Sequence, residues 1–177
     1  RTAEQFLALM RESDQALEEL ISYYSQCDEP TLVVFFGDHQ PPLNNAFYEA
    51  LYGKKLSERT TQEVLQQYAV PFFLWANYDI EERQDVVISP NYLGALTAQT
   101  AGLPLTGYME FLLQMYEVLP AITPVGFVTG DGQFLSKSEL SEEQKEWLWN
   151  YEVLNYCGMV DLFDEARPMF FAQESLS

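Results

Sequence analysis

The side chains best suited to chemistry in this sequence are a neighbouring aspartate and histidine, Asp38 and His39. A carboxylate oxygen and an imidazole nitrogen are ligands that divalent metal ions commonly take in proteins. His39 is also the only histidine of the chain. The pair therefore predicts half of a divalent metal site, with Asp38 and His39 as the metal ligands. The alternative is a structural turn, in which Asp38 accepts backbone hydrogen bonds and His39 packs nearby.

A short apolar stretch comes directly before this pair. Residues 31–36 (TLVVFF) combine β-branched and apolar side chains, which is typical of a strand buried on both faces in an α/β sheet. Gly37 ends the strand, because glycine permits a sharp turn and a close approach of two backbones. We therefore expect Asp38 and His39 just past the carboxyl end of this strand, where open α/β sheets bind their ligands.

The rest of the chain alternates helices with short strands. An amphipathic helix is expected from Thr2 to Tyr24, and a second buried strand over residues 70–76. A small hairpin is expected near residues 126–135. Its turn holds Asp131 between two glycines, so we interpret Asp131 as a turn residue and not as a ligand. The predicted fold class is α/β, a helix-flanked sheet with a small β-hairpin.

Length and charge narrow the range of functions. The 177 residues, 47% of them hydrophobic and 20% charged, suit a substantial core, so residues 1–177 are expected to form a single domain. The formal net charge is −18 with only 9 Lys and Arg residues, which excludes nucleic-acid binding through phosphate contacts. The same charge disfavours docking on an anionic membrane. No stretch of the sequence approaches the roughly 20 apolar residues of a membrane-spanning helix.

The two cysteines leave their pairing open. Cys27 and Cys157 each lie near the end of an expected helix. One disulfide and two separate thiols both fit the sequence. We favour thiols, because a chain of this size folds without covalent staples.

Residues 37–41 (GDHQP), placed after an apolar strand, resemble the second metal-binding motif of the alkaline phosphatase/sulfatase superfamily. Within it, the chain is most similar to the lipoteichoic acid synthase branch, whose members are membrane-anchored phosphoglycerol transferases. Three later stretches match that branch in the same order: residues 70–77 (VPFFLWAN), 89–93 (SPNYL) and 151–156 (YEVLNY). The resemblance covers most of this chain and corresponds to the C-terminal part of a sulfatase-like catalytic domain.

The resemblance implies a metal-dependent transfer of glycerol phosphate from a lipid donor through a phosphorylated threonine. It implies that Asp38 gives a carboxylate oxygen and His39 an imidazole nitrogen to Mn²⁺, with Mg²⁺ or Zn²⁺ as alternatives. The threonine precedes such a pair in the branch, and neither Thr2 nor Thr31 stands in a matching context. The parent protein is thus the expected enzyme, whereas this chain alone is expected to be catalytically incomplete and to bind the metal weakly. No catalytic or substrate-binding residue is assigned within it.

The same resemblance implies a cell-surface setting. The expected partners are the N-terminal half of the same catalytic domain and a lipid-linked glycerol phosphate. The expected location is the extracytoplasmic face of a membrane, to which upstream helices anchor the parent. Two other functions stay open. The Asp-His pair also occurs in sulfatases and phosphoethanolamine transferases, and a non-catalytic cell-surface domain could retain the fold without the reaction.

Overall fold

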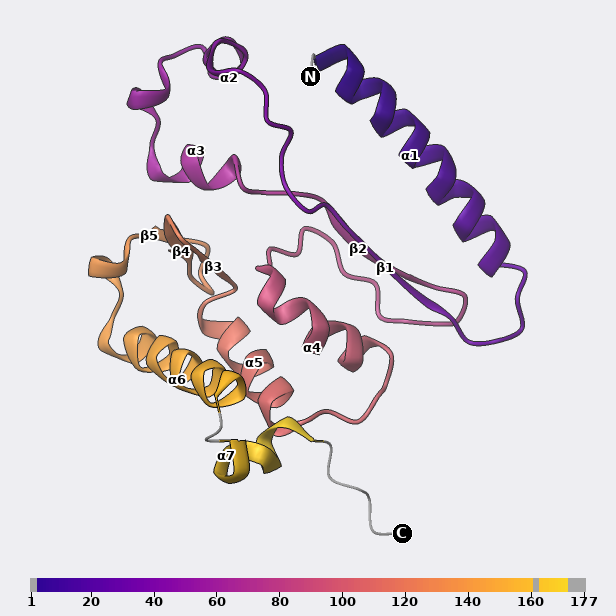
Figure 1. Ribbon diagram of the computed structural model, residues 1–177, viewed down its shortest axis with the longest axis vertical. Coiled ribbons are helices and arrows are strands. Elements are labelled where there is room, and N and C mark those ends of the chain that lie inside the picture. The colour runs from indigo at the N-terminus through magenta and orange to yellow at the C-terminus, as the bar shows by residue number, and fades with distance from the viewer. Residues whose placement is uncertain (1–2, 161–162, 172–177) are drawn as a thin grey trace. The chain divides into compact units, whose positions relative to one another are not determined.

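The computed structural model describes residues 3–160 and 163–171 of the chain. The chain divides into two compact units, Arg1–Ile80 (unit 1) and Glu81–Ser177 (unit 2). Both units combine helices with short antiparallel strands (Figure 1), so the predicted α/β class is confirmed. The expectation that residues 1–177 form a single domain stays a prediction.

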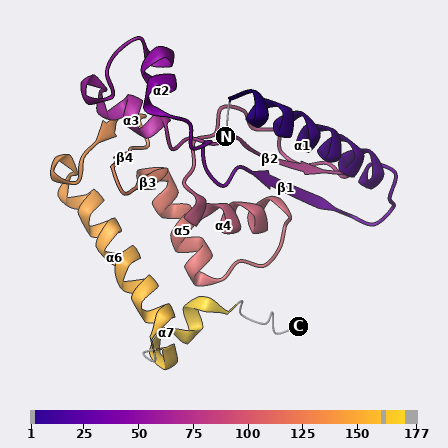
Figure 2. The ribbon, with the colours of Figure 1, turned by 45° about the horizontal axis from the view of Figure 1, so that its top comes forward.

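Unit 1 carries a pair of strands together with several helices. Its elements are α1 (Ala3–Tyr24), β1 (Leu32–Phe36), α2 (Asn45–Tyr52), a 3₁₀ helix (Leu56–Glu58), α3 (Thr61–Gln66) and β2 (Phe72–Ala76). The strands are antiparallel, and their register runs from Leu32 opposite Ala76 to Phe36 opposite Phe72. Helix α1 lies alongside the strand pair in both views (Figures 1 and 2). Both predicted strands and the predicted first helix are therefore present, although Thr2 lies outside the described residues.

The predicted burial of the two strands is wrong for this chain. All ten residues of β1 and β2 are apolar, yet eight are half-buried and two, Phe36 and Phe73, are exposed. Among the described residues of unit 1, the buried hydrophobic side chains are those of Tyr48 and Leu65. A strand becomes buried when neighbouring strands and covering layers surround it. Within the described residues β1 has one partner strand, β2. The apolar pattern is therefore present, but the neighbouring strands and layers that would bury it are not among these residues.

The side chain of Asn77 fixes the connection between α1 and β1. Its Nδ2 lies within hydrogen-bond distance of three backbone carbonyls, those of Tyr24 (3.1 Å), Cys27 (3.0 Å) and Glu29 (2.9 Å). Its Oδ1 accepts a hydrogen bond of 2.8 Å from the amide of Thr31. Because Asn77 directly follows β2, one side chain joins the end of that strand to the end of α1 and to the start of β1.

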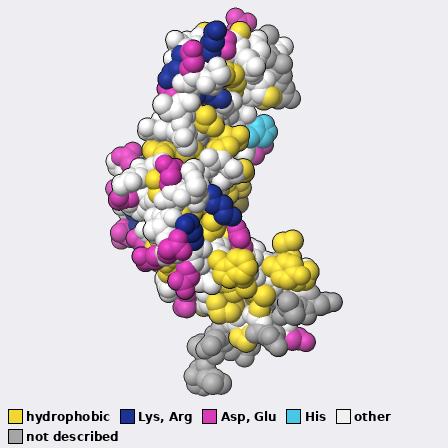
Figure 3. All heavy atoms as spheres, turned by 90° about the vertical axis from the view of Figure 1, so that its left-hand side faces the viewer, with side chains coloured by type: hydrophobic (Ala, Val, Ile, Leu, Met, Phe, Trp, Pro, Cys, Tyr) yellow, Lys and Arg dark blue, Asp and Glu magenta, His cyan; other side chains and the backbone are white. Residues whose placement is uncertain are grey.

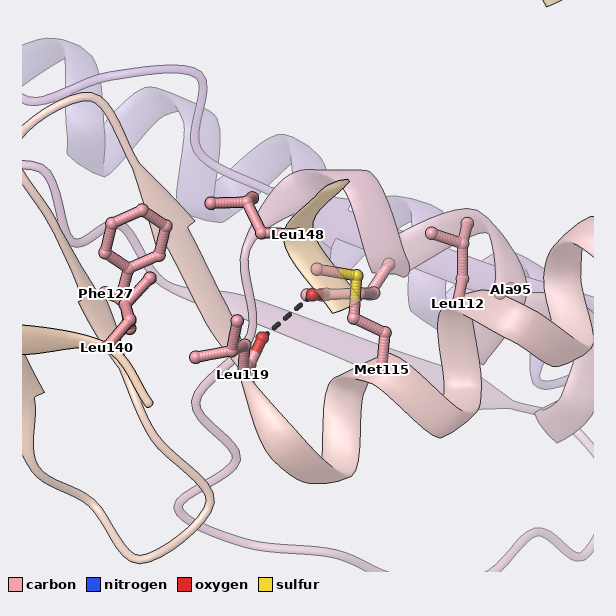
Figure 4. Close-up of a cluster of buried hydrophobic side chains, with 8 residues drawn as sticks. Ala95, Leu112, Met115, Leu119, Phe127, Leu140 and Leu148 are labelled. Carbon is pink, nitrogen blue, oxygen red and sulfur yellow. Dashed lines mark hydrogen bonds between the residues drawn. The ribbon is translucent and has the colours of Figure 1, made fainter. Parts of the chain in front are cut away.

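Unit 2 contains the main hydrophobic core. Its elements are α4 (Pro90–Thr100), α5 (Gly107–Val118), β3 (Ala121–Thr123), β4 (Gly126–Val128), β5 (Phe134–Leu135), a 3₁₀ helix (Lys137–Glu139), α6 (Glu142–Met159) and α7 (Phe163–Phe170). Figure 4 shows side chains from α4, α5, α6 and the β3–β5 region packed together. The cluster consists of Tyr92, Ala95, Leu112, Met115, Leu119, Phe127, Leu140 and Leu148.

The start of α4 is tied to the segment that follows α5. The amide of Ser89 donates to the carbonyl of Pro120 (2.9 Å), and the hydroxyl oxygen of Ser89 accepts from the amide of Ile122 (3.0 Å). The buried hydroxyl of Tyr92 donates to the carbonyl of Leu119 at 2.8 Å (Figure 4). These bonds place the beginning of α4 beside the end of α5, as expected for an antiparallel helix pair.

The predicted hairpin is confirmed, with one additional strand. Strand β4 pairs with β5 and also with β3, which the sequence analysis did not predict. Asp131 accepts hydrogen bonds from Thr129 Oγ1 and, at 2.7 Å, from Gln133 Nε2, so it stabilises the turn as predicted. Residue 130, just before Asp131, is a glycine because the backbone passes close to α5 there. A Cβ added at Gly130 would lie 2.2 Å from the carbonyl oxygen of Glu117.

The two cysteines are free thiols, as we favoured from the sequence. Cys27 lies in unit 1 and Cys157 in unit 2, and both side chains are half-buried. Both units are therefore held by non-covalent contacts in the described part of the chain.

We expect Asn77→Asp to destabilise unit 1. A carboxylate has no N–H group, so three carbonyl oxygens would face a negatively charged acceptor. The free energy of unfolding of unit 1 should fall by about 2–4 kcal/mol. Amide hydrogen exchange of Val33 and Phe35 measures this loss. The exposed Asn150→Asp on α6 is the matched control, and equal exchange rates in both variants would contradict the assigned role of Asn77.

The buried Tyr92 and the half-buried Tyr108 should make unit 2 sensitive to alkali. Burial raises the pKa of Tyr92, and burial together with the nearby Tyr151 raises the pKa of Tyr108 to about 12. Phenols in the unfolded chain ionise near pH 10, so from about pH 10 to 12 the unfolded state binds fewer protons than the native state. The free energy of unfolding therefore falls as the pH rises through this window.

Urea unfolding of unit 2 at about pH 10 and pH 11 measures the effect, which should be about 1 kcal/mol for each of these two tyrosines. Tyr108→Phe should show a smaller decrease than the unaltered chain. Tyr156→Phe is the control, because the Tyr156 side chain is 59% exposed. Identical pH dependence in the two variants would show that the Tyr108 hydroxyl does not contribute.

Candidate metal centre at the end of strand β1

Strand β1 ends at a glycine because two backbones meet there. The amide of Gly37 donates to the carbonyl of Pro71 at 3.0 Å, which extends the β1–β2 pairing by one residue pair. A Cβ added at Gly37 would lie 3.0 Å from the Cβ of Val70. Only glycine therefore fits without displacing Val70, and the chain can turn immediately into Asp38 and His39.

The side chains of Asp38 and His39 face each other past the end of β1. Asp38 Oδ2 lies 3.3 Å from His39 Nε2, and Asp38 Oδ1 accepts a hydrogen bond of 2.9 Å from the backbone amide of His39. Both side chains are exposed, Asp38 by 83% and His39 by 70%. The single histidine is visible at the surface in Figure 3. The pair is thus open to solvent and to any group that approaches it.

The imidazole of His39 is oriented by a backbone carbonyl. His39 Nδ1 lies 2.9 Å from the carbonyl oxygen of Gln40. A carbonyl oxygen can only accept a hydrogen bond, so Nδ1 carries the proton and donates it. In the neutral ring this arrangement leaves the lone pair on Nε2, the nitrogen that faces Asp38.

The pair can therefore act in two ways. With both ring nitrogens protonated, His39 forms an exposed ion pair with Asp38, which contributes little to stability. With Nε2 unprotonated, two lone-pair donors face each other and can bind one cation. Donor atoms about 2.0–2.2 Å from a shared ion at a tetrahedral angle are separated by about 3.4 Å. The observed 3.3 Å between Asp38 Oδ2 and His39 Nε2 fits that separation, so the donor set suits a divalent ion.

The pair supplies two ligands, whereas metal sites normally use three or four. Among the described residues, no group of three or more His, Cys, Asp and Glu side chains could hold a metal ion. The assignment of Asp38 and His39 as metal ligands therefore stays a prediction. Any tight site needs further ligands from segments outside this set.

The three later stretches that carry the resemblance have structural roles. Residues 70–77 form β2 and end in Asn77, whose side chain joins α1, β1 and β2. Residues 89–93 tie α4 to the segment after α5. Within residues 151–156, Asn155 Oδ1 accepts from the Tyr108 hydroxyl (2.9 Å) and its Nδ2 donates to the Tyr151 carbonyl (2.8 Å).

Sequence reasoning missed the side chains that hold the turn after β1. Gln40 Nε2 donates to the carbonyl of Ala69, and the Tyr48 hydroxyl donates to the carbonyl of Pro41 at 2.5 Å. Neither contact leaves a periodic pattern in the sequence. The only signal for them was the position of Tyr48 on an apolar helical segment.

Asp38 and His39, placed after a strand of an α/β fold, form a candidate metal centre. The sulfatase family model matches residues 1–103, which is more than half of the chain. The chain therefore belongs to the sulfatase family. The predicted membership of the alkaline phosphatase/sulfatase superfamily is confirmed.

Two further comparisons show which proteins the chain is similar to. A protein of Rhizobium meliloti (strain 1021), named "Putative cyclic beta-1,2-glucan modification protein", is 27% identical over 111 residues, which are 61% of this chain and 17% of that protein. The structure of the Streptococcus pyogenes phosphoglycerol transferase GacH in complex with sn-glycerol-1-phosphate superposes with a TM-score of 0.66 at 18% identity. That superposition covers 91% of this chain and 36% of GacH, and it shows the similarity of the fold. This chain thus spans well under half the length of either protein.

We expect Gly37→Ala to lower the free energy of unfolding of unit 1 by about 1–3 kcal/mol, because the added Cβ must displace Val70. Gly94→Ala is the matched control. A Cβ at Gly94 meets nothing within 4 Å, and alanine is the better residue inside helix α4 by about 0.5–1 kcal/mol. Urea unfolding of both variants should therefore give changes of opposite sign. Changes of the same sign would contradict the close approach at Gly37.

Proposed function

We propose that this chain is part of a metal-dependent transferase of the sulfatase family that moves glycerol phosphate. In this proposal Asp38 and His39 supply two ligands to a divalent ion, Mn²⁺ first, with Mg²⁺ or Zn²⁺ as alternatives. The observation that carries the proposal is the 3.3 Å approach of Asp38 Oδ2 and His39 Nε2 at the carboxyl end of β1 in a chain of this family. The similarity of its fold to a phosphoglycerol transferase favours this branch over the others.

The charge of the chain supports the need for a cation. The net charge of −18 repels a phosphate ester, and Asp38 adds a negative charge at the site itself. A bound divalent ion would reverse the local sign and would lower the pKa of an attacking hydroxyl. The residues of this chain hold and orient that ion, while the threonine hydroxyl that attacks phosphorus belongs to a segment outside residues 1–177. The phosphoglycerol group would pass from the lipid alcohol to the threonine and then to an acceptor hydroxyl.

The proposed partner of unit 1 is the remainder of the same catalytic domain. Its two strands present ten apolar side chains, none of them buried, whereas unit 2 has a core of its own. An apolar sheet of this kind is stabilised when further layers cover it. The same covering segments would bring the remaining ligands and the nucleophile to Asp38 and His39.

The hydrogen-bond pattern of β1 shows where a further strand can pair. The bonds from the Asn77 amide to Thr31 and from the Gly37 amide to Pro71 identify both residue pairs as hydrogen-bonded pairs. Such pairs alternate along antiparallel strands, so the backbone groups of Leu32, Val34 and Phe36 point away from β2. Within the described residues this edge carries no further strand. A neighbouring strand there would lie beside the end of β1 that carries Asp38.

The names of the compared proteins guide the choice of substrate. The GacH structure holds sn-glycerol-1-phosphate, which makes a glycerol phosphate the group to test. The Rhizobium protein is named for modification of a cyclic glucan, which makes a carbohydrate hydroxyl the acceptor class to test first. A lipid-linked glycerol phosphate stays the proposed donor.

The proposed location is the extracytoplasmic face of a membrane, with the anchor in another part of the protein. Within residues 3–160 and 163–171, none of the helices combines the length and the apolar character that crossing a bilayer requires.

The test is phosphoglycerol transfer by the full-length protein that carries this chain, with a fluorescent glycerophospholipid as donor, a glucan oligosaccharide as acceptor, and Mn²⁺. Asp38→Asn and His39→Ala should each lower turnover by about 100-fold or more, because each removes one metal ligand. Thermal unfolding of residues 1–177 with either substitution, measured without metal, should be unchanged, because both side chains are exposed. Asp79→Asn, on an exposed residue of the same unit, is the control and should keep full turnover.

Two results would overturn the proposal in different directions. Hydrolysis of an aryl sulfate, without transfer of glycerol phosphate, would assign the protein to the sulfate esterases. Absence of divalent-ion binding, together with no effect of His39→Ala on any turnover, would identify a non-catalytic domain that retains the fold.

A further inference from the structure

The turn that carries His39 is anchored by two side chains outside the metal pair. Gln40 Nε2 donates to the carbonyl of Ala69, in the segment that leads into β2. The hydroxyl of Tyr48, on α2, donates to the carbonyl of Pro41 at 2.5 Å. Tyr48 is only 9% exposed, whereas the His39 side chain is 70% exposed. A buried group thus holds the backbone from which an exposed ligand projects.

These two anchors act on the backbone that orients the imidazole. The His39 ring donates from Nδ1 to the carbonyl of Gln40, which lies between the anchored Gln40 side chain and the anchored Pro41 carbonyl. Pro41 is followed by Pro42, and the proline ring fixes φ at each position, so this backbone has few other conformations. The Pro41 carbonyl also accepts a 2.8 Å hydrogen bond from the amide of Leu43, which closes the turn.

The Gln40 carbonyl at Nδ1 and the Asp38 carboxylate at Nε2 compete for the single proton of the neutral His39 ring, so the direction of the carbonyl affects which nitrogen can bind a metal. While it accepts from Nδ1–H, the lone pair of the neutral ring is on Nε2 and faces Asp38 Oδ2. If the carbonyl turned away, the ring would be free to carry its proton on Nε2. The proton would then stand between His39 and Asp38, where the metal has to bind. Groups that orient a ligating histidine in this way typically change metal affinity by about 10–100-fold.

We propose that Gln40 and Tyr48 are positioning residues of the metal site, which hold the Gln40 carbonyl against His39 Nδ1–H and so present Nε2 to the metal. The metal part of this inference rests on the proposed function. The orientation of the ring is a property of the chain itself and can be measured without any metal.

The tautomer of His39 is directly visible by NMR, because the chain has a single histidine. Long-range ¹H–¹⁵N correlation of the ¹⁵N-labelled chain, recorded on the neutral ring, distinguishes the protonated from the unprotonated ring nitrogen. The unaltered chain should show a protonated Nδ1 and an unprotonated Nε2. Gln40→Ala and Tyr48→Phe should each shift this population toward protonated Nε2.

The matched controls are Gln66→Ala and Tyr68→Phe, which make the same changes at exposed positions of unit 1. Both should keep the tautomer of the unaltered chain. All four variants should fold, because Tyr48→Phe keeps the aromatic ring and the other three positions are exposed. Backbone amide spectra of each variant check the fold. Gln40→Glu is a second variant at this position, and its side chain has the same shape as glutamine. Its carboxylate cannot donate to the carbonyl of Ala69, so this variant should behave as Gln40→Ala.

Titration with Mn²⁺ alone supplies the second readout, since the paramagnetic ion broadens the His39 ring signals when it binds there. The concentration needed for half-broadening should rise about 10-fold in Gln40→Ala and Tyr48→Phe and should stay constant in the two controls. An unchanged tautomer in both Gln40→Ala and Tyr48→Phe would overturn the positioning role. Unchanged turnover of the full-length protein in His39→Ala, despite the expected tautomer, would instead contradict the metal assignment in the proposed function and leave the orientation of the ring established.

Discussion

The antiparallel pairing of β1 with β2 is the interaction on which the candidate site depends. It is continued at one end by the bond from the Gly37 amide to Pro71, and at the other by the bond from the Asn77 amide to Thr31. The first of these fixes the point at which the chain leaves the strand and presents Asp38 and His39. The second, with the Asn77 side chain, fixes where α1 ends and β1 begins. A change of register would move both ends together, so the location of Asp38 and His39 follows from this pairing.

The two units differ in how they are stabilised. Unit 2 buries a cluster of aromatic and aliphatic side chains from α4, α5, α6 and the small sheet, and its buried tyrosine hydroxyl is hydrogen-bonded. Unit 1 relies more on hydrogen bonds between the backbone and the Asn77, Gln40 and Tyr48 side chains, and its ten strand residues stay partly or fully exposed. Since apolar burial is the main driving force of folding, the unit with the candidate site is the one that gains most from cover by further segments. The difference in burial between the two units agrees with the comparison in which this chain covers 36% of a structurally similar transferase.

The features that the sequence predicted correctly are those set by neighbouring residues. The turn at Asp131 and the strand before Asp38 both follow from residue types a few positions apart. The burial of β1 and β2 was predicted wrongly, because an apolar run indicates the environment of a strand without showing which segments provide it. The contacts of Asn77 with Tyr24 and of Tyr48 with Pro41 were not predicted either. Such contacts depend on how the chain folds back on itself, and no periodic pattern records them.

The central claim is that Asp38 and His39 hold a divalent ion in a site completed by other segments of the same protein. A crystal structure of the full-length protein grown with Mn²⁺, with anomalous diffraction recorded at the manganese absorption edge, tests it most directly. The account predicts an anomalous peak about 2.0–2.3 Å from both His39 Nε2 and an Asp38 carboxylate oxygen, with further ligands from outside residues 1–177. A manganese peak elsewhere, with Asp38 and His39 still joined only to each other, would contradict it.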